Sequence, residues 1–191
     1  GHGVLADAEA SGVPPEAQEY YFSSLRDTVL PILRRLQECF RANGMEVIHT
    51  RIQSMTQDGR DRSAGHKRLG LHAAPGSKEA EFLEEIAPVG DELIVNKTAS
   101  GVFSSTNLAF ILNNMGIDAL VVVGVYTNEC VSTTVRDASD LGYLGTVIDD
   151  CCTTVTSELH DFTITVLKDR YARIMTTDEI IHEIEGQLGK G

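Results

Sequence analysis

The chain has 191 residues, a formal net charge of -12 and 42% hydrophobic residues. That length and apolar content suit one sizeable core, so we expect a single domain over residues 1–191. The sequence contains no stretch of roughly 18 apolar residues, the length that a membrane span needs. The acidic balance also disfavours nucleic acid and anionic membranes as partners, because clustered Lys and Arg carry those interactions.

The four cysteines show neither a CxxC pair nor the spacing of a disulfide framework. Two of them, Cys151 and Cys152, are adjacent, and adjacent cysteines rarely bridge each other. No charged and then apolar leader is visible at the N-terminus. These features together predict a reducing, cytoplasmic location, in which Cys151 and Cys152 serve as packing residues.

The first predicted element is a helix over residues 18–42, where apolar residues recur at helical intervals. Pro31 predicts a break or a fresh start near Asp27, because proline cannot continue the backbone hydrogen-bond ladder. Asn43 and Gly44 provide the stop signal.

Residues 51–76 lack periodicity and are rich in Gly, Arg and His. Long loops inside a compact domain are usually functional or mobile, so we expect a surface excursion that forms a lid or a subunit contact. Its basic side chains suit an acidic neighbouring surface in a chain of net negative charge. These are Arg60, Arg62, Lys67 and Arg68.

The remaining pattern alternates strands and helices, which favours an α/β fold. It predicts strands at 45–50, 92–96, 118–125, 144–149 and 172–175, and helices at 104–114, 129–141, 157–171 and 177–188. Repeated βα units imply a doubly wound, mostly parallel, Rossmann-like sheet in a three-layer α/β/α arrangement. In such folds the site lies at the carboxyl ends of the strands.

Cys130 stands where a buried strand gives way to a helix, in the segment GVYTNECV. Free backbone N–H groups and the helix dipole favour a thiolate there, and the same N–H groups can hold an oxyanion. Cys130 is therefore a candidate nucleophile. The alternative is a small core residue at a strand-helix junction, which is a common role for free cysteine.

Lys97 directly follows the predicted strand at 92–96 and so falls at the same edge of the sheet as Cys130. Side chains from independent strand ends that converge on one edge are typical of a multi-residue active site. The alternative for Lys97 is a surface lysine in a loop.

Three segments carry a resemblance to a known family. They are Asn96-Lys97 with SGVFSSTNL at 100–108, GVYTNECVSTTVRDASDLGY at 124–143, and VIDDCCTTVTSELHD at 147–161. With these segments, from about residue 25 to its end, the chain resembles the isochorismatase-like cysteine hydrolases. The sequence of these segments most resembles the N-carbamoyl and ureido amidohydrolases, such as biuret hydrolase.

The resemblance implies a catalytic set of Asp, Lys and Cys, which maps Lys97 and Cys130 onto two of the three roles. It implies a non-proline cis peptide at Val125-Tyr126 and an oxyanion hole formed by the backbone N–H groups of Tyr126 and Cys130. It also implies a small-molecule substrate, no cofactor, and a homo-oligomer, either a dimer or a tetramer.

The family's catalytic Asp closes a first apolar strand, and no such strand occurs before residue 20. Asp7 has no apolar strand leading to it, and Asp27 lies in helical spacing. We therefore expect the domain to lack its first strand, unless that strand and its aspartate are supplied in addition to this sequence. The loss of a central strand would expose two neighbouring strand edges.

The chemistry implied is acyl transfer to sulfur, in which Cys130 attacks a carbamoyl, ureido or amide carbonyl and the C–N bond breaks. Two other functions stay open. One is isochorismatase-type cleavage of a vinyl ether, which needs no nucleophilic cysteine, and Cys130 counts against it. The other is a non-catalytic assembly or binding role, which applies if the first-strand Asp is truly absent.

Candidates for substrate contact are Arg51 and Gln53, which follow the second strand, and the side chain of Tyr126. A loop arginine is more often a solvated or subunit-contact residue. His49 lacks the Asp-x-His spacing of the zinc-binding relatives, so we expect no metal and a core or supporting role for His49. His160 is expected to be structural.

Overall fold

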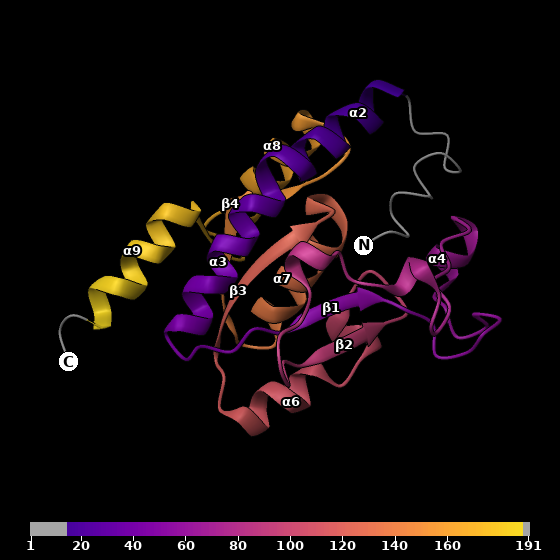
Figure 1. Ribbon diagram of the computed structural model, residues 1–191, viewed down its shortest axis with the longest axis horizontal. Coiled ribbons are helices and arrows are strands. Elements are labelled where there is room, and N and C mark those ends of the chain that lie inside the picture. Colours follow the sequence, from indigo (N-terminus) through magenta and orange to yellow (C-terminus); the bar gives the residue numbers. More distant parts are fainter. Residues whose placement is uncertain (1–14, 189–191) are drawn as a thin grey trace.

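The computed structural model describes residues 15–188 and shows parallel strands packed between helices (Figure 1). None of the described helices is long and apolar enough to cross a membrane. The helices are α2 (Pro15–Ser24), α3 (Leu30–Ala42), α4 (Ala64–Arg68), α5 (Val102–Ser105), α6 (Leu108–Met115), α7 (Ser132–Asp140), α8 (Ser157–Leu167) and α9 (Thr177–Leu188). The strands are β1 (His49–Ile52), β2 (Ile94–Lys97), β3 (Ala119–Val125), β4 (Leu144–Thr153) and β5 (Arg173–Met175).

The first helical region is broken where proline predicts it. A π turn, η1 (Leu25–Val29), separates α2 from α3, and Pro31 lies in the first turn of α3. Proline has no N–H to donate, so the regular ladder cannot run through this point. Asn43 ends α3, and its side-chain amide donates to the carbonyl oxygen of Cys39 at 2.8 Å.

The strands form two parallel sheets rather than one. β1 pairs with β2, and the other three strands pair in the order β3-β4-β5. Within residues 15–188 no ladder joins β1 to β3. The doubly wound α/β class is confirmed, but its sheet is divided in two between β1 and β3.

Helices cover both faces of the three-stranded sheet. On one face α3 and α9 pack on β4, and on the other α7 and α8 do so. Successive β4 side chains point to opposite faces, which gives two apolar clusters. One contains Leu36, Ile148, Cys151, Ile180 and Ile184, and the other contains Val131, Val135, Val147, Cys152, Leu167 and Ala172. Cys151 and Cys152 thus pack in the core, and burial raises the pKa of the Cys152 thiol to about 12.

Several boundaries differ from the sequence prediction. β1 begins at His49 rather than at residue 45, because its ladder with β2 starts with the pair His49 and Ile94. β4 extends to Thr153, four residues beyond the predicted end, and its register with β3 shifts between Val122 and Gly124.

Two predicted helices are also shorter or divided. The helix predicted at 104–114 is interrupted at Thr106, whose hydroxyl donates to the Val102 oxygen and accepts from the Leu108 N–H. α8 ends at Leu167 instead of residue 171, and Asp169 there adopts a φ of 60°. At both points a local turn ends the helix, although the spacing of apolar residues would allow it to continue.

The segment that lacks periodicity is ordered by polar side chains. Asp61 accepts from the N–H groups of Met55 and Thr56 at 2.7 and 3.2 Å and from the Thr56 hydroxyl at 2.6 Å. These bonds hold the pKa of the Asp61 carboxyl down to about 2. The segment contains α4, and the N–H of Ser63 donates to the Thr98 oxygen, which ties it to the loop after β2.

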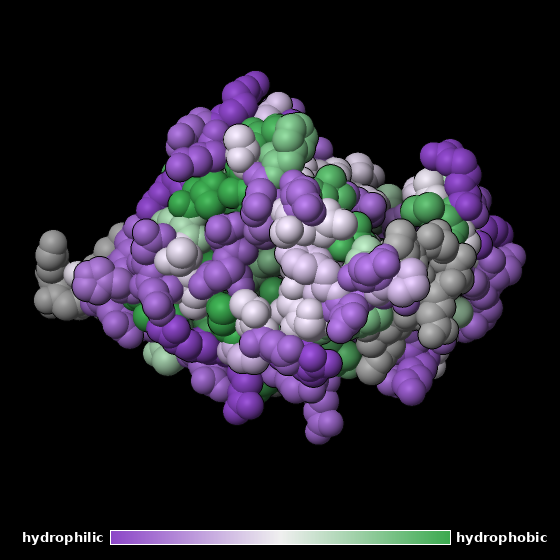
Figure 2. Space-filling view, turned by 90° about the horizontal axis from the view of Figure 1, so that it is seen from above, coloured by the Kyte–Doolittle hydropathy of each residue, from purple (hydrophilic) through white to green (hydrophobic). Residues whose placement is uncertain are grey.

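Outside the core the surface is mostly polar. The face in Figure 2 is largely hydrophilic, and hydrophobic residues show on it in separate patches. This distribution fits the net charge of -12.

Candidate functional site

Cys130 lies in a tight helical turn at the end of β3. The Val125-Tyr126 peptide bond is cis, and the next residues form a π turn, η4 (Thr127–Val131), that continues into α7. The helical segment therefore begins at Thr127, two residues before the predicted start. Cys130 is the fourth residue of this segment and stands inside the first turn rather than at its cap.

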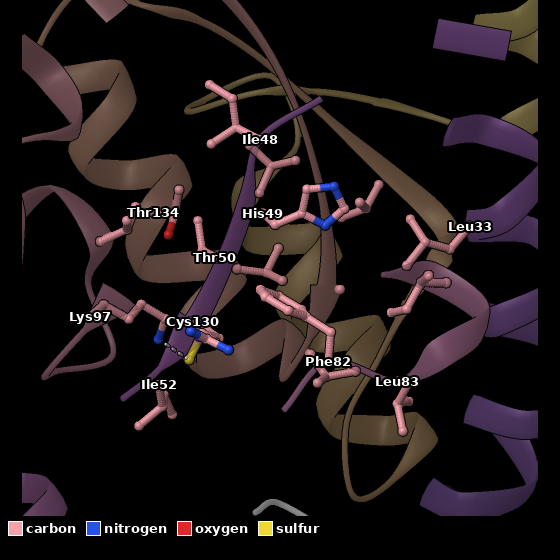
Figure 3. Close-up of a pocket in the computed structure, with 18 of the residues that line it drawn as sticks. Leu33, Ile48, His49, Thr50, Ile52, Phe82, Leu83, Lys97, Cys130 and Thr134 are labelled. Carbon is pink, nitrogen blue, oxygen red and sulfur yellow. Dashed lines mark hydrogen bonds between the residues drawn. The ribbon is translucent and has the colours of Figure 1, made fainter. Parts of the chain in front are cut away.

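Lys97 and Cys130 meet directly (Figure 3). The Nζ of Lys97 lies 3.1 Å from the Sγ of Cys130, although Lys97 ends β2 of one sheet and Cys130 lies in the turn after β3 of the other. The same ammonium donates to the backbone oxygens of Ala99 at 3.1 Å and Ser100 at 3.0 Å. Lys97 is only 4% exposed. The structure thus brings together the two residues that the sequence placed at one sheet edge.

The charge on Lys97 has no carboxylate beside it in residues 15–188. None of the ion pairs in this part of the chain includes Lys97. Its three polar contacts are two carbonyl oxygens and the thiol. Burying an ammonium is costly without a partner of opposite charge, so the arrangement favours an anion at this position.

Hydrogen bonds between polar side chains hold the turn that carries Cys130 in place. The Thr127 hydroxyl lies 2.9 Å from His160 Nδ1, and His160 Nε2 lies 2.9 Å from a carboxylate oxygen of Asp149. The Thr154 hydroxyl donates to the side-chain oxygen of Asn128 at 2.5 Å. His160 therefore has a structural role, as expected.

The sequence analysis did not predict which side chains form hydrogen bonds with this turn. A signal was present, because Thr127 and Asn128 are two polar residues between an apolar strand and the cysteine. Thr127 is fully buried, and a buried hydroxyl requires a partner. Which residue supplies it depends on how α8 packs on β4, and periodicity does not reveal that.

The residues predicted to contact the substrate, Arg51, Gln53 and Tyr126, lie in different surroundings in the structure. Arg51 lies within β1, donates to the Asn96 side chain at 2.8 Å and to the Ala80 oxygen at 2.7 Å, and places its guanidinium 4.9 Å from the centre of the Phe82 ring. Burial lowers the pKa of Arg51. Gln53 follows β1, and its N–H donates to the Lys97 oxygen at 3.1 Å.

Tyr126 packs its ring edge-on against Tyr21, with the ring centres 5.1 Å apart. Burial is the main cause that raises the pKa of Tyr21 well above its usual range, and the neighbouring Tyr126 and Cys130 add to it. α2 therefore reaches over the turn that carries Cys130. This contact joins residues far apart in the sequence and was not predicted.

His49 takes part in a polar cluster with Glu92 and Arg41. Its Nε2 lies 2.8 Å from Glu92, which also accepts two bonds from Arg41 at 2.7 and 2.9 Å. The Arg41 guanidinium is the first of several contacts that hold the pKa of the Glu92 carboxyl down to about 2. Between residues 15 and 188, no group of three or more His, Cys, Asp or Glu side chains is placed to hold a metal ion.

Of the two aspartates considered for the third catalytic role, the structure describes only Asp27, which is not at the site. Asp27 lies in the exposed π turn η1 and pairs with Arg26 at 2.7 Å. Asp7 lies outside the described residues.

A largely apolar cavity of about 360 Å³ opens beside Lys97 and Cys130. It runs between β1 and β3 and is closed by α3 and by the segment after β1 (Figure 3). Arg51 is among the residues that line it, whereas Gln53 and Tyr126 are not. Others are Val29, Leu33, Ile48, Ile52, Phe82 and Val123.

Comparison with known proteins matches residues 16–179 to the isochorismatase domain. The chain is 31% identical over 125 residues to N-carbamoylsarcosine amidase of an Arthrobacter species, a match that covers 61% of this chain and 46% of that protein. It is 36% identical over 83 residues to ureidoacrylate amidohydrolase RutB of Acinetobacter baylyi, covering 44% and 34%. The chain spans less than two thirds of the length of these curated relatives.

Among solved structures, N-carbamoylsarcosine amidase from Thermoplasma acidophilum superimposes with a TM-score of 0.67 at 26% identity. That match covers 87% of both chains. An isochorismatase-like hydrolase from Alkaliphilus metalliredigens gives a TM-score of 0.71 at 29% identity and covers 82% of this chain and 83% of that one.

Proposed function

The chain belongs to the isochorismatase family, and on that premise we propose that it is a cysteine amidohydrolase. Its substrate would be a small carbamoyl, ureido or amide compound whose C–N bond it cleaves. The observation that carries the proposal is the 3.1 Å contact between Lys97 Nζ and Cys130 Sγ, made by a lysine that is almost fully buried. Two relatives that are named as an amidase and an amidohydrolase support the same class of reaction.

In this mechanism the Cys130 sulfur attacks the carbonyl carbon and forms a tetrahedral intermediate. The ammonium of Lys97 lies 3.1 Å from this sulfur, where it can hold the sulfur in position for attack. When the intermediate collapses, the C–N bond breaks and the nitrogen leaves with a proton as ammonia or an amine. Water then hydrolyses the acyl-sulfur bond and restores the thiol.

The developing oxyanion needs hydrogen-bond donors that are already in place. We assign this role to the backbone N–H groups of Tyr126, which precedes the turn after β3, and of Cys130, which lies within it. The bonds from Thr127 to His160 and from Thr154 to Asn128 support it, because they hold that turn rigidly. A positioned donor of this kind typically contributes about 10²- to 10³-fold in rate.

The reaction also needs a group that accepts the thiol proton. In residues 15–188 no carboxylate pairs with Lys97, so the acceptor is a separate part of the proposal. The charge on Lys97 makes a carboxylate the best-suited group. A cleavage of vinyl ethers would leave the Lys97–Cys130 contact without a role, which favours the amidase over that alternative.

Substrate recognition falls to the side of the cavity formed by β1. Arg51 uses its Nε and one terminal nitrogen on Asn96 and Ala80. Guanidinium has five N–H donors, so others are left for a carboxylate or carbonyl of the substrate. Gln53 and Tyr126 are secondary candidates, because neither lines the cavity.

The test is release of ammonia from a panel of N-carbamoyl, ureido and simple amide compounds, measured for the unchanged protein, Cys130→Ser and Cys39→Ser. We expect release with the unchanged protein and Cys39→Ser, and at least a ~10³-fold loss with Cys130→Ser. Mass spectrometry of the acidified reaction should find the acyl group on Cys130. Turnover that survives in Cys130→Ser would exclude covalent catalysis, and no turnover on any compound would favour a non-catalytic role.

We further propose that the protein forms a homo-oligomer, a dimer or a tetramer. Within the excursion at 51–76, Arg60, Arg62 and Lys67 each bond to groups of the same segment, so its basic charge is partly used internally. Exposed apolar side chains elsewhere, including Phe110 at 67% and Leu144 at 72%, suit subunit contacts. Light scattering at micromolar concentration tests this, and a monomer would contradict it.

A further inference from the structure

Tyr21 is a polar residue that α2 contributes to the wall of the cavity beside Cys130. It lines this cavity, and only 2% of its surface is exposed. Its ring meets the ring of Tyr126 edge-on, with the ring centres 5.1 Å apart, and the ring of Phe22 at 5.3 Å. Aromatic packing therefore fixes where its hydroxyl lies.

The Tyr21 hydroxyl forms no hydrogen bond within residues 15–188. In the same part of the chain, the fully enclosed polar side-chain atoms without a partner are Gln37 Oε1, His66 Nδ1 and Ser77 Oγ, and the Tyr21 oxygen is not one of them. This oxygen therefore keeps some accessible surface. Because Tyr21 is almost completely buried and lines the cavity, that surface faces the cavity.

The surroundings of this hydroxyl leave room for an acceptor from a ligand. Buried tyrosine hydroxyls usually have a hydrogen-bond partner, and leaving one without a partner is costly. The side chains that α3 and the turn before it add to the cavity wall near α2 are apolar, and include Leu25, Val29, Leu30 and Leu33. A bound molecule with an oxygen at this place supplies the partner.

The hydroxyl also lies near the candidate nucleophile. Burial is the main cause that raises the pKa of Tyr21, and the neighbouring Tyr126 and Cys130 raise it further. Cys130 lines the same cavity, and its contact with Lys97 comes from β2 rather than from α2. A substrate whose carbonyl carbon meets the Cys130 sulfur therefore has Tyr21 close to its remaining atoms.

We propose that Tyr21 is a substrate-binding residue, whose hydroxyl donates a hydrogen bond to an uncharged oxygen that lies beyond the carbonyl attacked by Cys130. This assignment rests on the proposed function, because it places that carbonyl at the Cys130 sulfur. It makes Tyr21 a determinant of specificity. Compounds with a ketone, ether or second amide oxygen at this place bind better than compounds with a methylene group there.

Two observations define the chemistry of this oxygen. Because burial raises the pKa of Tyr21, the hydroxyl keeps its proton at neutral pH and acts as a donor. The Lys and Arg side chains among the described lining residues are Arg51 of β1 and Lys97 of β2, and neither comes from α2 or α3. A carboxylate at Tyr21 would be buried beside apolar side chains without a cation from these helices, which is costly.

The test uses two pairs of amides in which one oxygen-bearing group replaces a methylene group. Acetoacetamide is paired with butanamide, and β-methoxypropionamide is paired with pentanamide. Saturable protection of Cys130 against alkylation by iodoacetamide, followed by mass spectrometry, gives the Kd of each compound without requiring turnover. We expect the oxygen-bearing member of at least one pair to bind roughly 3- to 10-fold more tightly than its partner.

Two variants of α2 show whether Tyr21 causes this preference. Tyr21→Phe removes the hydroxyl but keeps the ring that packs on Tyr126, and it should make the two members of the pair bind equally. Tyr20→Phe is the matched control, because it makes the same change on the same helix at a residue outside the described lining of the cavity. It should leave the preference unchanged.

Three results would overturn the proposal. They are a lack of preference within both pairs in the unchanged protein, a preference that survives in Tyr21→Phe, and an equal loss of affinity for both members of a pair, which would indicate a structural role alone. Malonamate, which carries a carboxylate in place of the ketone group, tests the charge of the acceptor. Its Kd should be the same in Tyr21→Phe, and a loss as large as that of acetoacetamide would contradict an uncharged acceptor.

Ammonia release from the same compounds separates the role of Tyr21 from the proposed reaction. If kcat/KM shows the preference and Tyr21→Phe removes it, both are supported. If protection shows the preference but no compound releases ammonia, Tyr21 binds the oxygen as assigned and the proposed hydrolysis fails for these amides. If ammonia is released with equal kcat/KM within each pair, the proposed function stands and the assignment of Tyr21 is wrong.

Discussion

The two sheets that meet at the site are stabilised in different ways. The three-stranded sheet is covered by helices on both faces and packs apolar residues such as Val147 and Ile148 at zero exposure. The two-stranded sheet is short, and polar groups support it: Glu92 links Arg41 to His49, and Arg51 links β1 to Asn96 of β2. The nucleophile belongs to the apolar half, and its lysine belongs to the polar half.

This difference explains how Cys130 and Lys97 are each held in position. Cys130 is placed by a turn whose polar residues bond to β4 and α8, elements that are already held by the core. Lys97 is placed by four pairs of strand register and by two backbone oxygens of its own loop. The contact between them is the Nζ to Sγ hydrogen bond beside the cavity between β1 and β3, so a change in either half should alter this contact.

The largest effect is expected at Lys97, where the two halves meet. Lys97→Ala should lower turnover by about 10³-fold or more, because it removes the only cation beside the thiol in the described part of the chain. Lys97→Arg keeps the charge but replaces a compact ammonium with a planar fork, so it should not restore the rate. Steady-state kinetics on the best substrate of the panel measure both variants, and a near-native rate in Lys97→Arg would make Lys97 a general cation.

The next largest effect is a loss of stability, which should be greater in the three-stranded sheet than in the two-stranded sheet. Ile148→Ala removes a fully buried side chain packed among α3 and α9 and should lower the free energy of unfolding by about 3–4 kcal/mol. Ile52→Ala, in the lining of the cavity, should cost about 1 kcal/mol, since that side chain is only half-buried. Urea unfolding of the two variants measures the difference. Equal losses would show that the cavity wall at β1 is as tightly packed as the core.

A pH-dependent effect is expected from the polar half. The folded pKa of Glu92 is lowered to about 2 from a usual 4.5, so its contribution to stability is fully present above pH 4.5 and is lost as the pH falls toward 2. Replacing Glu92 by Gln should therefore cost about 2 kcal/mol near pH 7, and the cost should vanish near pH 2. Urea unfolding across this range tests the sign. The exposed pair of Glu183 with Arg173 provides the control, for which about 0.5 kcal/mol or less is expected.

The smallest effect concerns the turn of the nucleophile. Thr127→Val keeps the shape of a buried side chain but removes the bond to His160, at a cost of about 1 kcal/mol. Alkylation of Cys130 by iodoacetamide, followed by mass spectrometry, should slow by severalfold, while Cys39 reacts as before. Thr163→Val is the matched control, because it removes a hydroxyl bond within α8 and leaves the bond between Thr127 and His160 in place. An unchanged rate at Cys130 would show that His160 does not position the turn.

Much of the fold follows from local patterns in the sequence. The alternation of strands and helices, the break before Pro31 and the position of Cys130 after β3 all follow from spacing and from the chemistry of single residues. Strand ends were predicted less well, because a strand begins where its neighbour offers a partner. β1 starts at His49 for this reason, although the apolar run before it is equally extended in pattern.

The candidate site was likewise predicted in part from the sequence, and the rest required the tertiary structure. The sequence by itself predicted that Lys97 and Cys130 lie close together, because each stands at or beyond the carboxyl end of a predicted strand and such ends share an edge in a parallel sheet. Only the tertiary structure decided that their atoms are in contact, that His160 bonds to the turn, and that a cavity separates β1 from β3. These relations join residues 33 positions apart or more, and they depend on how helices pack on the sheets, which no local pattern encodes.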